Sequence, residues 1–237
     1  MKKNIRIAIA TLALVGAHIS GSTQPIPIFG IVELSGPGTT AGTNYDNGVK
    51  LAVSEINAAG GILGRKIAYT SWDTQTQPGV AKALVSKAID QDAPLVMGPV
   101  YSGSILVSMA ETRRAEVPNM IGGEAAAITQ QGNPYVFRAS FTQASAMPKV
   151  VRYIKEIVKA KTIAIIYVNN DFGKGGRDMV IKGFEAANIK VVADISTDAG
   201  QVDFSSAVIK AKQSNADALF AYSNDCLLYT SPSPRDS

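Results

Sequence analysis

The sequence contains a single cysteine, Cys226, and a single histidine, His18. One cysteine excludes an internal disulfide, and these two residues alone cannot supply a His/Cys cluster with metal-binding spacing. The chain also lacks the GxSxG, CxxC and Tyr-xxx-Lys patterns that mark nucleophilic, redox and dehydrogenase sites. We therefore expect a protein that is not an enzyme, with no catalytic residues, no metal and no cofactor.

A strong net charge is also missing once the two ends are set aside. The formal net charge of the 237-residue chain is +4. Lys2, Lys3 and Arg6 lie in the N-terminal stretch, and Arg235 and Asp236 lie near the other end. The remainder is close to neutral, so the composition does not support a basic nucleic-acid-binding surface. We expect no nucleic acid partner.

The longest apolar run lies at the N-terminus. Met1 to about Gln24 combines a basic start with an apolar stretch from Ile7 to Ala17, followed by small and polar residues. This pattern is typical of a secretory signal and is too short to span a membrane. The alternative is a buried N-terminal strand or helix. We expect residues 1–24 to be a cleaved signal peptide and the protein to be periplasmic. No cysteine there takes a lipid, so we expect a soluble protein rather than a lipoprotein.

Residues 28–64 read as a strand, a glycine-rich loop and a helix. An apolar run at 28–32 predicts a buried strand, and apolar positions from Tyr45 to Ile56 follow one helical face. Thr43 and Asp46 resemble a capping box at the start of this helix, and residues 60–61, both glycine, predict its end. In a parallel α/β sheet, such a strand–loop–helix unit builds the edge where ligands bind.

The rest of the chain alternates between strand and helix patterns. Further strands are predicted at 66–72, 94–97, 117–121, 162–168, 190–195 and 217–222. Helices are predicted between them, at about 78–89, 102–115, 147–158, 174–187 and 204–212. This rhythm predicts parallel sheets with helices on both faces. We expect one lobe at 25–140 and a second at 141–225, with a crossover at 138–142.

The last twelve residues, 226–237, break this pattern, because CLLY gives way to a Ser- and Pro-rich end. They resemble the translated adaptor ends of fragmentary genes, and we expect a non-native tail that follows an incomplete second lobe. A genuine disordered terminus is the alternative.

Several motifs recur in order along the chain and carry a family resemblance. They are ELSGPGTTAGTNYDNGVKLAVSEINAAGGILGRKI at 33–67, WDTQTQP at 72–78, VMGPVYSGS at 96–104, GNPYVFRAS at 132–140 and NNDFGKGG at 169–176. With these motifs the chain resembles the branched-chain amino-acid binding proteins of ABC importers, from about Ile26 to Asp225. The resemblance implies the type I periplasmic-binding fold, with two doubly wound parallel-sheet lobes. It also implies a receptor that takes an amino acid or related small polar solute to a membrane ABC permease.

The resemblance also implies ligand-binding positions in the first lobe. The loop after the third strand would present a hydroxyl and backbone N–H groups to a ligand carboxylate, with Tyr101 in that loop and Ser102 on the ligand-facing position. Ser102 would also serve as a helix N-cap. Gly122 and Gly123 match small residues of the family, and Glu124 stands near a family Thr or Ser. Glu124 would suit an ammonium or another donor-rich group. The alternative is an exposed or helix-capping glutamate.

Further ligand-facing positions follow from the same resemblance. Phe172 matches an aromatic residue that packs over the ligand, although an ordinary core aromatic remains the alternative. Asn224 matches a ligand-facing loop position, and Thr39 and Thr40 are candidate lining donors. Ala41 stands where some relatives have Tyr, which implies a roomier pocket.

Two other functions share parts of this pattern. A ligand-sensing domain of a receptor would have the same fold. The glycines of the loop at 36–42 are spaced GxGxxxG, a weak variant of nucleotide-binding loops, so a secreted nucleotide-binding enzyme is the least favoured reading. Plain turn geometry explains that loop better. The related DNA-binding repressors need an N-terminal helix-turn-helix, where this chain has an export leader. The identity of the ligand stays open.

Overall fold

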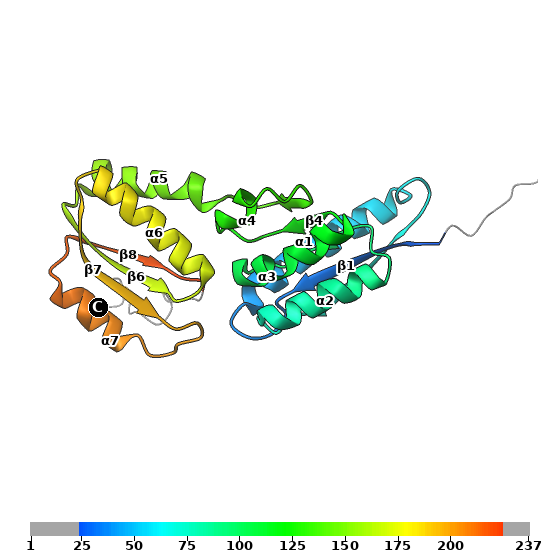
Figure 1. Cartoon of the computed structure of the whole chain (residues 1–237), viewed down its shortest axis with the longest axis horizontal. Coiled ribbons are helices and arrows are strands. Elements are labelled where there is room, and N and C mark those ends of the chain that lie inside the picture. Colours follow the sequence, from blue (N-terminus) through cyan, green and yellow to red (C-terminus); the bar gives the residue numbers. More distant parts are fainter. Residues whose placement is uncertain (1–23, 225–237) are drawn as a thin grey trace, which may run out of the picture.

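The computed structural model describes residues 24–224, which form two α/β lobes along the long axis of the molecule (Figure 1). The expected cleavage site, the tail at 226–237 and Cys226 lie outside these residues. Within the described residues, none of the helices combines the length and apolar character that a membrane crossing needs.

The first lobe is built on a five-stranded sheet with the order β2-β1-β3-β4-β5. All of its strand pairs are parallel. The strands are β1 Ile26–Val32, β2 Ile67–Asp73, β3 Val96–Met97, β4 Asn119–Ile121 and β5 Val136–Arg138. The helices are α1 Thr39–Ala58, α2 Pro78–Asp90, α3 Ser102–Ala115 and the short α4 Ala127–Gln130.

The second lobe has a three-stranded parallel sheet with the order β7-β6-β8. Its strands are β6 Thr162–Val168, β7 Lys190–Thr197 and β8 Ala218–Tyr222. Its helices are α5 Gln143–Tyr153, which continues into the π-helical turn η1 Ile154–Val158, α6 Asp171–Ala186 and α7 Ser205–Gln213. The expected α/β fold with parallel sheets in two lobes is confirmed.

Side chains along β6 alternate between the two faces of the second sheet. Ile163 and Ile165 face α5 and α6, where they share a buried cluster with Phe184. Ala164 and Ile166 face α7. Both faces of the strand are therefore covered, as in a doubly wound sheet, and Figure 1 shows α6 and α7 on opposite sides of it.

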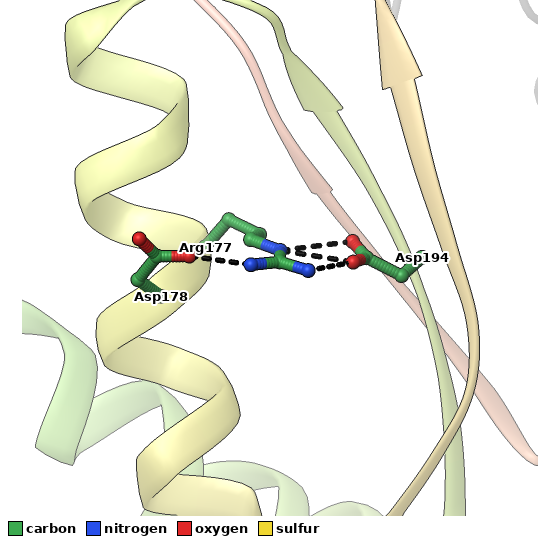
Figure 2. Close-up of polar contacts among 3 residues, drawn as sticks. All are labelled: Arg177, Asp178 and Asp194. Atoms are coloured by element: carbon green, nitrogen blue, oxygen red, sulfur yellow. Dashed lines mark hydrogen bonds and ion pairs between the residues drawn. The ribbon is translucent and has the colours of Figure 1, made fainter.

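An ion-pair group fastens α6 to β7 (Figure 2). The Arg177 guanidinium donates from Nε to both carboxylate oxygens of Asp194, at 3.1 and 2.9 Å, and a second nitrogen also contacts Asp194. Its third nitrogen donates to Asp178 at 2.5 Å. These hydrogen bonds raise the pKa of Arg177 above its ordinary value. The group lies at the surface, where ion pairs contribute little stability.

The predicted start of α1 is wrong. The helix begins at Thr39, four residues before the expected capping box, and its N-cap Gly38 makes no side-chain cap. Gly42 lies in the first turn, where a Cβ atom would fall 2.1 Å from the carbonyl oxygen of Glu33. Glycine therefore lets α1 start against the end of β1. Thr43 lies inside the helix, and buried Asp46 accepts hydrogen bonds from the hydroxyls of Tyr69 and Ser71 instead.

Other boundaries differ less. The short α4 and β5 were not predicted, and Arg138, expected in the crossover, ends β5. Helix α6 begins at Asp171 rather than 174, because Asn170 caps it by accepting a hydrogen bond from the Gly173 N–H at 2.9 Å. The helix at 102–115 and the strand at 162–168 have their predicted bounds, and Pro78 opens α2 as predicted.

Candidate functional site

A small cavity of about 90 Å³ lies where the two lobes face each other. Its lining comes from the segments that follow β3, β4 and β8 and from the starts of α1, α3 and α6. This is the carboxyl edge of both parallel sheets, where loops after the strands build ligand sites. The described residues that line it are Ala41, Val100, Tyr101, Ser102, Gly122, Gly123, Glu124, Phe172 and Asn224.

Most of the predicted site residues meet at this cavity, but Thr39 and Thr40 do not line it. Because α1 starts early, both threonines belong to its first turn. The Thr39 hydroxyl donates to the carbonyl oxygen of Gly36 at 2.6 Å, and Thr40 is exposed. Ala41 lines the cavity in their place.

Ser102 is 3% exposed and is the first residue of α3 rather than its N-cap. The expectation that it caps the helix is wrong, because Tyr101 occupies the N-cap position without a side-chain cap. The Ser102 hydroxyl oxygen instead accepts a hydrogen bond from the Ala125 N–H at 3.2 Å. This bond ties the start of α3 to the segment after β4. A serine hydroxyl that accepts one bond keeps its own proton as a donor.

Glu33 is a residue of this region that the sequence analysis did not single out. Its side chain is fully buried at the end of β1 and accepts hydrogen bonds from the N–H groups of Val100 at 3.1 Å and Tyr101 at 3.2 Å. Burial raises the pKa of its carboxyl, and these hydrogen bonds oppose the rise. The sequence did contain a signal for this role. Glu33 is a single acidic residue that directly follows a buried strand, at the edge where ligands were expected.

Glu124 is half-buried and lies between backbone groups that other residues hold in place. Its carbonyl oxygen accepts a hydrogen bond from the Gln143 N–H at 3.0 Å. The Arg138 guanidinium donates to the carbonyl oxygens of Gly123 at 2.6 Å and Ala125 at 3.0 Å. Burial raises the pKa of the Glu124 carboxyl, and the Arg138 charge opposes this.

The carboxylate of Glu124 has no hydrogen bond or ion pair with any residue among 24–224. It does not cap the nearest helix, because the N-cap of α4 is Ala126. A partly buried carboxylate at a cavity wall with no partner can accept hydrogen bonds from a ligand.

The second lobe supplies an aromatic wall. Phe172 is 7% exposed, and its ring stacks on Tyr222 with 4.4 Å between centroids. Phe172 is therefore packed as a core residue on one side while it lines the cavity on another. Nearby, the side-chain amide of Asn170 donates a hydrogen bond to the side-chain oxygen of Asn224, a second lining residue, at 3.3 Å.

The glycines of the 36–42 loop serve close packing. Gly36 has a φ of 76°, and a Cβ atom on Gly38 would fall 2.8 Å from the Tyr101 ring. At Gly42 a Cβ atom would clash with the backbone oxygen of Glu33. These constraints agree with turn geometry rather than with a phosphate cradle.

The chain is similar to known proteins over most of its length. A family model described as periplasmic binding protein matches residues 25–225. The leucine-specific-binding protein of Salmonella typhimurium is 28% identical over 222 residues, which cover 93% of this chain and 60% of that protein. The chain thus spans about three fifths of the length of this curated relative.

Solved structures share the fold. The substrate-binding protein of a branched-chain amino acid transporter from Streptococcus pneumoniae, in complex with isoleucine, superposes with a TM-score of 0.75. It is 29% identical, and the match covers 83% of this chain and 56% of that one. A periplasmic binding protein type 1 from Bordetella pertussis is 27% identical with a TM-score of 0.77, covering 83% and 55%.

Proposed function

The chain belongs to the periplasmic binding protein family, and we propose that it is an extracytoplasmic receptor that captures an amino acid or related small polar solute for an ABC importer. The observation that carries the proposal is the cavity at the carboxyl edge of both sheets, with lining residues from both lobes. The names of the relatives support this class of function, because they describe binding of leucine and of branched-chain amino acids.

We assign roles to the lining residues on chemical grounds. Ser102 offers a hydroxyl at the start of α3, and Gly122 and Gly123 leave room for the solute to approach the backbone. Glu124 accepts from a donor-rich group, and Tyr101, Phe172 and Asn224 cover the rest of the solute. Each role is binding rather than catalysis.

Ligand contacts in both lobes imply a closure mechanism. We propose that 25–140 and 141–225 act as the two lobes, which move about the connection near 138–142. A solute that touches both walls binds the closed arrangement more tightly and shifts the population toward it.

We also propose the cellular setting. Residues 1–24 would direct export, the mature protein would act in the periplasm, and a membrane ABC permease would receive the solute. The family supports this setting, since its members are named for the periplasm.

A thermal-shift screen of the purified chain tests the proposal. The panel contains amino acids, amides and small carboxylates, with ATP and NAD as the nucleotide arm. We expect a rise in melting temperature with members of the first group only. A rise with nucleotides alone would overturn the receptor function in favour of nucleotide binding.

A further inference from the structure

We propose that the cavity recognises a small organic cation through a protonated amine, and that a carboxylate on the solute is not required. This inference rests on the proposed receptor function. It concerns the charge of the solute. Glu124 lines the cavity, whereas Glu33 and Asp171 lie near the start of α3 outside its lining.

Glu33 already accepts hydrogen bonds from the two N–H groups that directly precede α3. The N-terminus of a helix attracts anions through unpaired N–H groups and its dipole. Here the N–H groups of Val100 and Tyr101 donate to the buried Glu33 carboxylate at 3.1 and 3.2 Å. A solute carboxylate at this position would compete with Glu33 for the same two N–H donors.

Two further carboxylates lie at the cavity or near the start of α3. Glu124 lines the cavity and has no hydrogen-bond partner among residues 24–224. Asp171 is the first residue of α6 in the second lobe, and a Cβ atom on Gly103 would lie 3.2 Å from its Oδ2 atom. Asp171 thus brings an acidic group of the second lobe close to the first turn of α3, outside the lining of this cavity.

Compensating cations do not line the cavity. None of its described lining residues is Lys or Arg. The charge that acts on Glu124 is that of Arg138, whose guanidinium is bound to the carbonyl oxygens of Gly123 and Ala125 and to the Thr129 hydroxyl. Three of its hydrogen bonds are thus made to the protein rather than to a solute anion.

The aromatic wall suits the same ligand. Phe172 lines the cavity and stacks on Tyr222, and Tyr101 lines it from the first lobe. Aromatic faces attract organic cations, and the attraction grows when water is excluded. An amine therefore finds a hydrogen-bond acceptor in Glu124 and aromatic surface beside it.

Three solutes with the same branched carbon skeleton test the solute amine and the solute carboxylate separately. Leucine carries both groups, isopentylamine lacks the carboxylate, and 4-methylpentanoate lacks the amine. Binding to the purified chain is measured by isothermal titration calorimetry at pH 7. We expect isopentylamine to bind at least as tightly as leucine, and 4-methylpentanoate to show no binding at the same concentrations.

Two variants test the role of Glu124. Glu124→Gln keeps the shape but removes the charge, and we expect it to weaken amine binding about tenfold or more, as for loss of a hydrogen bond to a charged group. Glu55→Gln, on the exposed surface of α1, is the matched control and should bind as the wild type does.

The outcomes distinguish this inference from the receptor function. Binding of leucine or 4-methylpentanoate without binding of isopentylamine would overturn amine recognition and leave the receptor function standing. Amine recognition would also be overturned if the Glu124→Gln variant bound an anionic solute from the wider screen with the same affinity as the wild type. If no solute of any class binds, both proposals fail.

Discussion

The side-chain amide of Gln143 donates a hydrogen bond to the backbone oxygen of Phe172 at 2.7 Å. The same nitrogen donates to the Tyr222 hydroxyl at 3.0 Å, and the Gln143 backbone N–H donates to the Glu124 carbonyl oxygen at 3.0 Å. Gln143 is fully buried at the start of α5. One residue thus connects the acidic wall of the cavity in the first lobe with the aromatic wall in the second.

Replacing Gln143 by Ala should lower the free energy of unfolding by roughly 1–3 kcal/mol, because the Phe172 oxygen and the Tyr222 hydroxyl lose a buried donor. Solute binding should weaken as well, since the two walls lose their connection. Urea denaturation and calorimetry measure the two effects. Gln213→Ala, at the exposed end of α7, is the control and should change neither quantity. Equal stability of the two variants would contradict this role.

Gly42→Ala should destabilise the protein by about 1–3 kcal/mol or more, because the added Cβ atom would fall 2.1 Å from the backbone oxygen of Glu33 and neither backbone can easily move. Gly48→Ala in the same helix has open space around it and should stabilise the protein by about 0.5–1 kcal/mol. Thermal and urea unfolding of both variants test the contrast. The expectation fails if the two substitutions shift stability in the same direction.

Ser102→Ala should weaken solute binding by roughly 1–3 kcal/mol, because a buried hydroxyl donor is lost at the start of α3. It should also cost some stability, since the Ala125 N–H loses its acceptor. Titration with a solute identified in the screen gives the affinity, and Ser54→Ala on the exposed face of α1 is the control. Unchanged affinity in Ser102→Ala would remove this side chain from the site.

Glu124→Gln should make the solute-free protein more stable at neutral pH. Burial raises the pKa of Glu124 in the folded state, so folding disfavours its charged form. The destabilisation appears as the pH rises above the ordinary glutamate range and vanishes below it, where the group is protonated in both states. The gain over wild type should therefore be present at pH 7 and absent near pH 4. Urea denaturation at both values, with Glu55→Gln as control, tests this sign.

The sequence determined those elements whose pattern is strong and local. The predicted bounds agree with the structure for the helix at 102–115, the strand at 162–168 and the start of α2 at Pro78. In these elements the apolar periodicity and the residues that start or end the element lie within the element itself. Seven of the predicted site residues line one cavity for a related reason. The loops that carry them follow parallel strands, and the carboxyl ends of such strands share one edge.

Only the tertiary structure decided the features that depend on contacts far apart in the chain. Helix α1 starts early because Gly42 packs against the backbone of Glu33, and this displaces Thr39 and Thr40 from the cavity lining. The use of Glu33 as an internal partner for the N–H groups before α3 depends on residues 67 and 68 positions away. Gln143 connects two lobes through partners that no local pattern places beside it. Local periodicity sets which face of an element is apolar, but distances between elements, and therefore the charges that meet in the cavity, follow from how the sheets and helices pack.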